Sequence, residues 1–215
     1  MQPSPPKLLT REGPLWVFDK PSGLRVHAAG DDGADDLMSW ARRELRAPEA
    51  LAPIHRLDAG TSGLLLASSD PAERKDLGAA FAAGDVSKRY QALVFGLTHE
   101  KGKIERPLMD VRRGRPLDAL SRYERLRAFG RVASLLSLKP ESGRKHQLRR
   151  HLQQIGHGIV GDERYRDKRR RRVPRFPGRL WLHAAELELP DGRRFEAPLA
   201  AELAEHLEQL EKLFA

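Results

Sequence analysis

The chain has 215 residues, no cysteine and a formal net charge of +9, because 39 lysines and arginines outnumber 30 aspartates and glutamates. A chain of this length can bury a full core, which predicts one compact domain. The lack of cysteine excludes a disulfide framework, a thiolate metal site and a cysteine nucleophile. The excess of positive charge favours a polyanionic partner, RNA or DNA first, and an arginine-rich surface that only keeps the protein in solution is the alternative.

The start of the chain carries no targeting signal. Residues 1–13 open with a polar, proline-rich stretch, and we expect a flexible leader before a single domain over residues 14–215. No uncharged apolar run approaches the ~18 residues that are needed to span a bilayer. We therefore expect a cytoplasmic monomer that does not enter a membrane.

The N-terminal half is expected to mix strands and helices. Short apolar runs rich in branched and aromatic residues predict strands over residues 15–19, 64–67 and 87–96. Asp35 is the expected cap of a helix that runs to about Leu45. Asp70 caps a second helix, with proline in its first position, and Gly84 ends it.

The C-terminal half continues the mixture. Further strands are predicted over residues 132–138 and 180–187, with short β-like pieces around residue 104 and over 120–126. Ser142 is the expected cap of a helix over residues 144–155, and Pro198 starts a final helix. Strands that outnumber scattered helices indicate a mixed α/β domain of the α+β kind.

The densest basic run is Arg166–Arg175, which prolines follow. It is too polar for a core element, so residues 166–178 are predicted to form a mobile basic insertion at the surface. Arg169 and Arg170 in this insertion are expected to contact RNA. A solvated loop without a partner is the alternative.

The segment His55–Gly63 has the composition of a functional loop. It places one carboxylate, Asp58, between Arg56 and two hydroxyl groups, and a buried apolar run follows at once. A loop fixed on a rigid element is where chemistry usually takes place. A tight turn whose polar side chains only satisfy backbone groups is the alternative.

Several common catalytic arrangements are missing from the sequence. It contains no glycine-rich loop of the dinucleotide or Walker type, no HExxH pair and no G-x-S-x-G elbow. What is left is Asp58, together with arginines and Tyr90. A carboxylate can attack a sugar carbon or act as a base, and an aromatic ring can stack on a base that has left its stack. On a basic chain, this combination points to chemistry on a nucleotide within RNA.

These motifs together resemble the RluA-type pseudouridine synthases, which isomerise uridine to pseudouridine in ribosomal or transfer RNA. The matching segments occur in order along almost the whole chain and are Asp19–Leu24 with Val26–His27, His55–Asp58 with Thr61–Leu65, Lys88–Ala92 with Gly96, Gly143–Arg149 with His151, Gly161–Asp162 with Tyr165, and Leu182–Ala184. Each segment alone is a weak signal, and their joint occurrence is a strong one.

The resemblance implies an α+β fold with a mainly antiparallel sheet, flanking helices and a catalytic cleft across the sheet. It also implies RNA as the partner, either tRNA or rRNA, and no metal or other cofactor. We expect no small basic N-terminal domain of the S4 type, which some relatives carry. The alternative function is a non-catalytic RNA-binding or ribosome-assembly protein on the same scaffold.

The resemblance also assigns roles to residues of the site. Asp58 corresponds to the essential aspartate, which attacks the ribose C1′ of a flipped-out nucleotide or helps to form a glycal. Tyr90 is expected to stack on the uracil, with a place in the sheet core as the alternative. Arg149 is expected to pair with Asp58, and Arg144 is the competing candidate for that pairing.

Three further residues are expected to contact the substrate. The resemblance implies that Leu182 gives apolar contact to the flipped base. Arg56 is a candidate for holding the RNA stack open. His55 is the third candidate, with a structural hydrogen bond as its alternative role.

Overall fold

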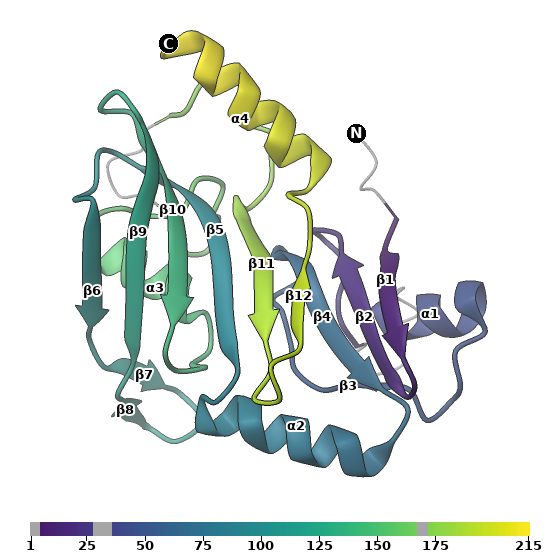
Figure 1. Cartoon of the computed structure of the whole chain (residues 1–215). Coiled ribbons are helices and arrows are strands. Elements are labelled where there is room, and N and C mark those ends of the chain that lie inside the picture. The colour runs from purple at the N-terminus through teal and green to yellow at the C-terminus, as the bar shows by residue number, and fades with distance from the viewer. Residues whose placement is uncertain (1–4, 28–35, 167–171) are drawn as a thin grey trace. The chain divides into compact units, whose positions relative to one another are not determined.

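The computed structural model describes residues 5–27, 36–166 and 172–215. The chain divides into two compact units. Unit 1 consists of Met1–Val86 and Ala184–Pro198, and unit 2 consists of Ser87–His183 and Leu199–Ala215. Each unit combines antiparallel strands with helices, which confirms the predicted α+β class (Figure 1). No helix within the described ranges is both long and apolar enough to cross a bilayer.

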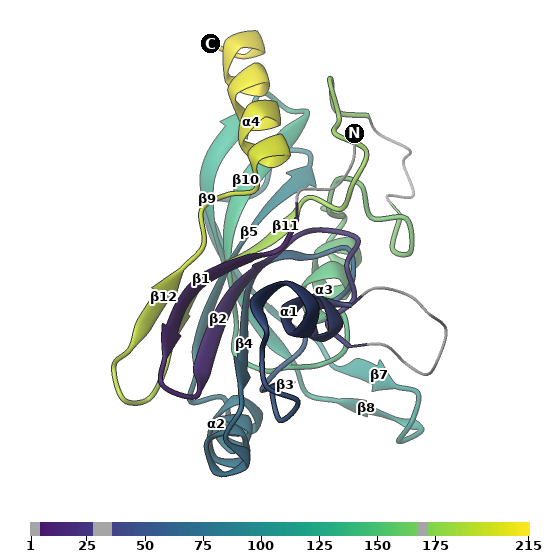
Figure 2. The ribbon, with the colours of Figure 1, turned by 90° about the vertical axis from the view of Figure 1, so that its right-hand side faces the viewer.

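Unit 1 is built on a sheet with the strand order β1-β2-β4-β11. Its strands are β1 (Lys7–Glu12), β2 (Leu15–Lys20), β3 (Ala52–Pro53), β4 (Ser62–Ser68), β12 (Arg194–Glu196) and the part of β11 (Leu182–Glu188) from Ala184 onward. The pairs β1–β2, β2–β4, β3–β4 and β11–β12 are antiparallel, and Figure 2 shows β1, β2 and β4 side by side. The strands predicted over 15–19 and 64–67 are therefore confirmed.

The predicted flexible leader is wrong from Lys7 onward. Residues Lys7–Glu12 form the edge strand β1, which pairs with Leu15–Asp19 of β2. Gly13 turns the chain between the two strands with a positive φ of 59°. The alternation of exposed and half-buried residues in β1 is the pattern of an edge strand. Residues 1–4 lie outside the described part of the chain.

The two helices of unit 1 begin at aspartate caps. Helix α1 (Leu37–Leu45) is capped by Asp36, whose carboxylate accepts hydrogen bonds from the backbone of Met38 at 2.8 Å and Ser39 at 3.0 Å. The predicted cap, Asp35, precedes it and lies outside the described residues. Helix α2 (Pro71–Ala83) starts at Asp70 and ends at Gly84, as predicted, and packs against β4.

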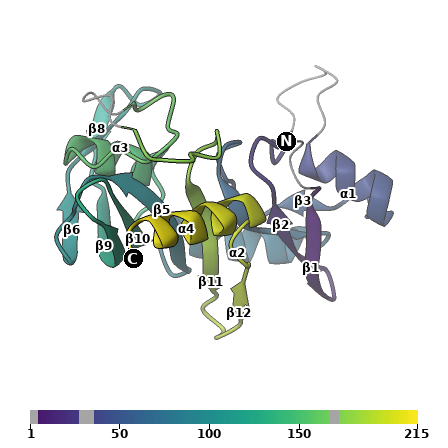
Figure 3. The same ribbon diagram turned by 90° about the horizontal axis from the view of Figure 1, so that it is seen from above.

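Unit 2 is built on the antiparallel sheet β5-β10-β9-β6. Its elements are β5 (Ser87–Phe95), β6 (Lys101–Glu105), β9 (Leu120–Phe129), β10 (Ala133–Pro140), the hairpin of β7 (Leu108–Asp110) with β8 (Arg115–Leu117), α3 (Gln147–Gln154) and α4 (Ala201–Leu213). Helix α3 packs against β9 and β10, and Figures 2 and 3 show α4 at one end of these strands. Leu148 and Leu152 of α3 and Leu203 and Leu210 of α4 complete the core of this unit.

Helix α3 begins later than predicted and without the predicted cap. The hydroxyl of Ser142 donates to the side-chain oxygen of Gln147 at 2.8 Å, and that oxygen also accepts from the backbone of Arg144 at 3.1 Å. His146 then takes a left-handed conformation with φ of 54°, so the helix starts at Gln147. The glutamine side chain thus organises a turn where a serine cap was expected.

The C-terminal end of the predicted basic insertion is not a free surface loop. Val173 is buried, and the Pro174 carbonyl accepts a hydrogen bond from His206 Nε2 at 2.8 Å. The other ring nitrogen of His206 accepts from Trp181 Nε1 at 3.1 Å. Residues 172–174 are therefore held by α4, whereas residues 167–171 lie outside the described part of the chain.

Candidate active site

Asp58 lies on the loop between β3 and β4 of unit 1, and it is half-buried. The Asp58 carbonyl accepts a hydrogen bond from Thr61 N at 3.0 Å, which closes a tight turn. Ser22 donates its hydroxyl to Gly60 O at 2.8 Å, and Gly23 N donates to Ala59 O at 2.8 Å. The turn that carries the carboxylate is therefore fixed through its backbone by the segment after β2.

Lys20 is the main support of this loop, and sequence reasoning missed it. Its side chain is fully buried, and Nζ donates to the carbonyls of Pro21 at 2.9 Å, Leu24 at 2.8 Å and Ala59 at 3.1 Å. Burial of an ammonium group is costly unless it is hydrogen-bonded, and three carbonyls satisfy its three donors. Lys20 thus joins the turn after β2 to the residue that follows Asp58.

Gly63 fixes the place where the loop enters β4. Its φ is 107°, and a Cβ at this position would lie 2.2 Å from the Ala184 carbonyl oxygen of β11. Only glycine allows this conformation and this close approach. The glycine in the Thr61-Ser62-Gly63 motif is therefore required by packing within unit 1.

His55 and Arg56 precede Asp58 and have different surroundings. His55 Nε2 accepts a hydrogen bond from Leu66 N at 3.1 Å, and the ring stacks on Phe81 of α2 with centroids 4.4 Å apart. This is the structural role that was the alternative for His55. Arg56 is exposed, so its guanidinium is accessible to a ligand.

Tyr90 and Lys88 lie on the same face of β5 in unit 2, because side chains alternate along a strand. Tyr90 is opposite Leu138 of β10 and packs, half-buried, against the core. Lys88 is buried, and this burial lowers the pKa of its ammonium group despite the opposing effect of Glu141. The strand predicted over residues 87–96 is confirmed as β5.

Arg149 on α3 forms a bidentate ion pair with Asp162. Its Nε and Nη2 donate to the two carboxylate oxygens at 2.7 and 2.8 Å, and the Asp162 side chain is only 1% exposed. Asp162 Oδ1 also accepts from the backbone of Arg164 at 3.0 Å and Tyr165 at 2.9 Å. Burial alone would raise the pKa of Asp162, but these donors together hold it below its usual value.

Tyr165 completes the group around Arg149. The guanidinium carbon lies 5.2 Å from the centre of the Tyr165 ring, and the phenol oxygen is hydrogen-bonded to His146 Nδ1 at 3.0 Å. The motif Gly161-Asp162 with Tyr165 therefore sets the orientation of Arg149. The sequence pattern contained these residues, but it did not reveal this role.

The other predicted site residues have separate positions. Leu182 is buried at the start of β11, in the core of unit 2. Arg144 precedes α3, and its Nε donates to Asp118 O at 3.0 Å. Arg169 and Arg170 lie outside the described residues. The predicted pairing of Arg149 with Asp58 stays a prediction.

Comparison with known proteins identifies the family of this fold. A family model described as RNA pseudouridylate synthase matches residues 14–154. The tRNA pseudouridine synthase C of Haemophilus ducreyi is 34% identical, with 82% of each chain covered. The ribosomal large subunit pseudouridine synthase C of Vibrio cholerae is 36% identical, over 91% of this chain and 65% of the relative.

Solved structures agree with the sequence relatives. Human RNA pseudouridylate synthase domain containing 4 superposes with a TM-score of 0.78 and 25% identity, over 95% of this chain and 92% of the human chain. The residues that the family model matches include the Asp58 loop, Tyr90 and Arg149. The chain therefore belongs to the RNA pseudouridylate synthase family and is an RNA pseudouridine synthase.

Proposed function

We propose that this enzyme isomerises a specific uridine of tRNA or rRNA in the cytoplasm, as a monomer, with Asp58 acting at C1′ of a flipped-out nucleotide. The observation that carries the proposal is the loop of half-buried Asp58, whose backbone is fixed by Lys20, Ser22 and Gly23. A carboxylate held on a rigid turn keeps its orientation toward the reacting atom during the reaction. The relatives named for tRNA and for rRNA support both substrate classes.

The reaction exchanges one bond for another on the same nucleotide. Asp58 attacks C1′, or assists formation of a glycal, and the bond from C1′ to N1 of the uracil breaks. The detached uracil turns, and C5 forms a bond to C1′ as the bond from Asp58 to C1′ breaks or, on the glycal route, as a proton returns to C2′. The proton on C5 is then lost while N1 gains one. Electrons balance without an oxidant or reductant, because a carbon–nitrogen bond is replaced by a carbon–carbon bond.

Arg149 is proposed to keep Asp58 ionised and oriented toward C1′ of the nucleotide. An arginine beside a carboxylate favours its charged form, which is the form that can act as a nucleophile or base. The ion pair with Asp162 fixes the guanidinium of Arg149 through Nε and Nη2, and we propose that the guanidinium held in this way also faces Asp58. Arg144 is the less suitable partner, because its Nε is engaged by the Asp118 carbonyl.

The remaining contacts concern the flipped base and the RNA around it. We propose that Tyr90 stacks on the uracil and takes part in the transfer of the C5 proton, and that Leu182 adds apolar contact. Exposed Arg56 is proposed to fill the gap that the nucleotide leaves in the stack. Arg169 and Arg170 are proposed to add phosphate contacts.

RNA that carries tritium at C5 of uridine tests the proposal. Isomerisation releases tritium while the RNA strand stays intact and no free base appears. Asp58→Asn should bind the RNA with near-normal affinity and release no tritium. Tritium release by this variant at the wild-type rate would contradict the mechanism. Mapping pseudouridine in RNA from a strain that lacks the protein would then identify the modified uridine.

A further inference from the structure

The sheet of unit 2 has two faces of different character. On β9, Ser121 Oγ is hydrogen-bonded to His151 Nδ1 of α3 at 2.9 Å and accepts from Gln147 Nε2 at 3.0 Å. Ser121 and Tyr123 therefore point to the α3 face, and the alternation along the strand turns Arg122 to the opposite face. Tyr90 lies on the α3 face as well, because it is in register with Leu138, which is in register with Tyr123.

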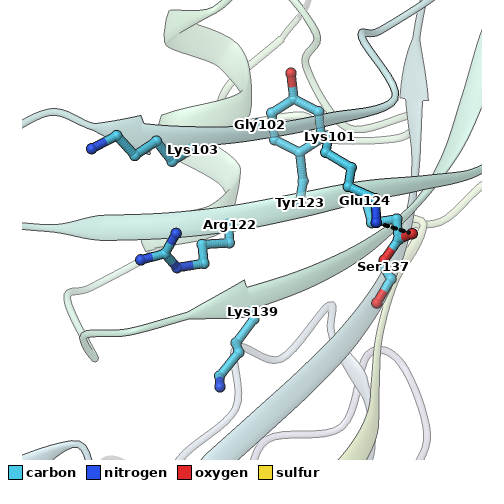
Figure 4. Close-up of a pocket in the computed structure, with 8 residues that line it drawn as sticks. All are labelled: Lys101, Gly102, Lys103, Arg122, Tyr123, Glu124, Ser137 and Lys139. Carbon is cyan, nitrogen blue, oxygen red and sulfur yellow. Dashed lines mark ion pairs between the residues drawn. The ribbon is translucent and has the colours of Figure 1, made fainter.

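Three cations form a row on the face opposite α3. Arg122 of β9 is in register with Lys103 of β6 on one side and with Lys139 of β10 on the other. Figure 4 shows the three side chains extending to the same side of these strands. Like charges directly opposite each other destabilise a strand pair, so this row is unfavourable in the free protein. Such an arrangement is typical of a surface that meets an anion.

The counterions of this row do not neutralise it. Lys103 pairs with Glu105 at 2.9 Å and Arg122 pairs with Glu141 at 3.1 Å, at side chains that are exposed by 36 to 65%. Pairs that are so exposed contribute little and are screened by salt, so phosphate groups can replace them. Within the described part of the chain, Lys139 forms no ion pair, and it is exposed.

The row lies beside a hollow of about 400 Å³ between β6, β9 and β10. Lys101, Glu124 and Ser137 also line this hollow, next to the row. The Ser137 hydroxyl accepts from Arg89 Nη1 at 3.3 Å, which brings a further cation from β5 to this face. With strands ~4.8 Å apart, the three residues of the row span roughly 10 Å. An RNA or DNA duplex presents several phosphate charges over this length.

We propose that Lys103, Arg122 and Lys139, here named the cationic row, bind backbone phosphates of the substrate RNA away from the modified nucleotide. This inference rests on the proposed function for its RNA. Exposed lysines and arginines fit phosphates, which carry charge but no sequence information. Tyr90 and Arg149 belong to the α3 side of the sheet and the cationic row to the other side, so only an RNA that passes around the unit contacts both.

The test compares two triple variants that each remove three positive charges. Lys103→Gln, Arg122→Gln and Lys139→Gln together remove the cationic row. The control combines Lys75→Gln, Arg131→Gln and Lys212→Gln, three exposed cations on other parts of the surface. The control variant should unfold at the wild-type temperature, because its three changes lie at exposed positions. The row variant should unfold at that temperature or above, because it loses the repulsion between like charges.

For full-length substrate RNA, we expect the row variant to have about a tenfold higher Kd and KM than the control and an unchanged kcat. The slope of log K against log salt concentration should fall by roughly two, as expected when three phosphate contacts are lost. On a short stem-loop that contains only the modified uridine and its neighbours, the two variants should have equal KM.

Equal Kd, KM and salt slope for the two variants on full-length RNA would overturn the proposal. Failure of the proposed function is distinguishable: the wild type would then release no tritium from any uridine-labelled RNA.

Discussion

Two carboxylate residues in this enzyme, Asp58 in unit 1 and Asp162 in unit 2, differ in how deeply they are buried. Asp162 is 1% exposed, and its oxygens accept two bonds from Arg149 and two from backbone N–H groups. Asp58 is half-buried, and the bonds that fix its turn are made by the backbone of residues 58–60. The Asp162 carboxylate thus takes part in holding unit 2 together, and the turn that carries Asp58 is held through its backbone. A turn fixed through its backbone keeps its conformation when the bonding of its side chain changes during a reaction.

Removal of the carboxylate charge at Asp162 should have the largest effect on stability. Asp162→Asn leaves the guanidinium of Arg149 nearly buried without its counterion, and such a loss costs about 3–5 kcal/mol. Chemical denaturation at pH 7 would measure this loss. Since Asp162 lies outside the reacting group in our account, the fraction that stays folded should retain RNA binding. An Asp162→Asn protein as stable as the wild type would contradict the structural role of the Asp162 carboxylate.

The same ion pair gives stability a pH dependence. The pKa of Asp162 in the folded protein is below its usual value, so the folded state binds the proton less readily than the unfolded state. Its contribution is therefore present above pH ~4, the pKa of an unfolded aspartate, and is lost as the pH falls through the folded value. Denaturation curves between pH 3 and pH 7 should show a smaller loss on acidification for Asp162→Asn than for the wild type.

The support of the Asp58 loop is expected to have the next largest effect. Lys20→Met keeps the length of the side chain but leaves three carbonyls without their donor. We expect a loss of about 2–4 kcal/mol, since one unsatisfied buried group costs about 1–3 kcal/mol and the site can relax in part. The folded variant should also have a lower kcat, because Asp58 is less well positioned. Lys20→Arg serves as the control, because it retains the positive charge. A Lys20→Met enzyme with wild-type kcat would contradict the role of Lys20 in positioning the Asp58 loop.

The smallest effect is expected at His206, far in sequence from both carboxylates. Burial lowers the pKa of this histidine, which donates to Pro174 O and accepts from Trp181 Nε1. The folded protein therefore favours the neutral imidazole. The contribution of His206 to stability is present above pH ~6.5, the pKa of an unfolded histidine, and is lost as the pH falls through the lowered pKa of the folded protein. His206→Gln should cost about 1 kcal/mol at pH 7, and this difference from the wild type should shrink toward pH 5. Unfolding curves at both pH values measure the change, and a constant difference would contradict this assignment.

Local signals in the sequence were sufficient for elements whose boundaries depend on neighbouring residues. The cap at Asp70 and the proline after it place the start of α2 correctly. The same reasoning failed at Ser142, because the side chain of Gln147, five residues later, organises that turn and the chain bends at His146. It also failed at β1, where a short edge strand with alternating polar residues has little apolar signal.

The sequence was sufficient to propose the candidate site residues, but not to find the residues that support them. Asp58, Tyr90 and Arg149 could be selected from motifs, because each motif is contiguous in sequence. The role of Lys20 depends on a contact with a residue 39 positions away, and a lysine in a turn is ordinarily exposed. The role of Asp162 likewise depends on the fold, which brings it to Arg149 on α3. Supports of this kind are visible only in three dimensions.

The central claim is that the carboxylate of Asp58 performs the chemistry, and a single-turnover measurement tests it most directly. Asp58→Asn should fold with wild-type stability and bind substrate RNA with a Kd close to that of the wild type. With enzyme in excess over tritium-labelled RNA, it should give no detectable pseudouridine over a time in which the wild type converts all of the RNA. Pseudouridine formation by Asp58→Asn at a rate close to that of the wild type would contradict the account.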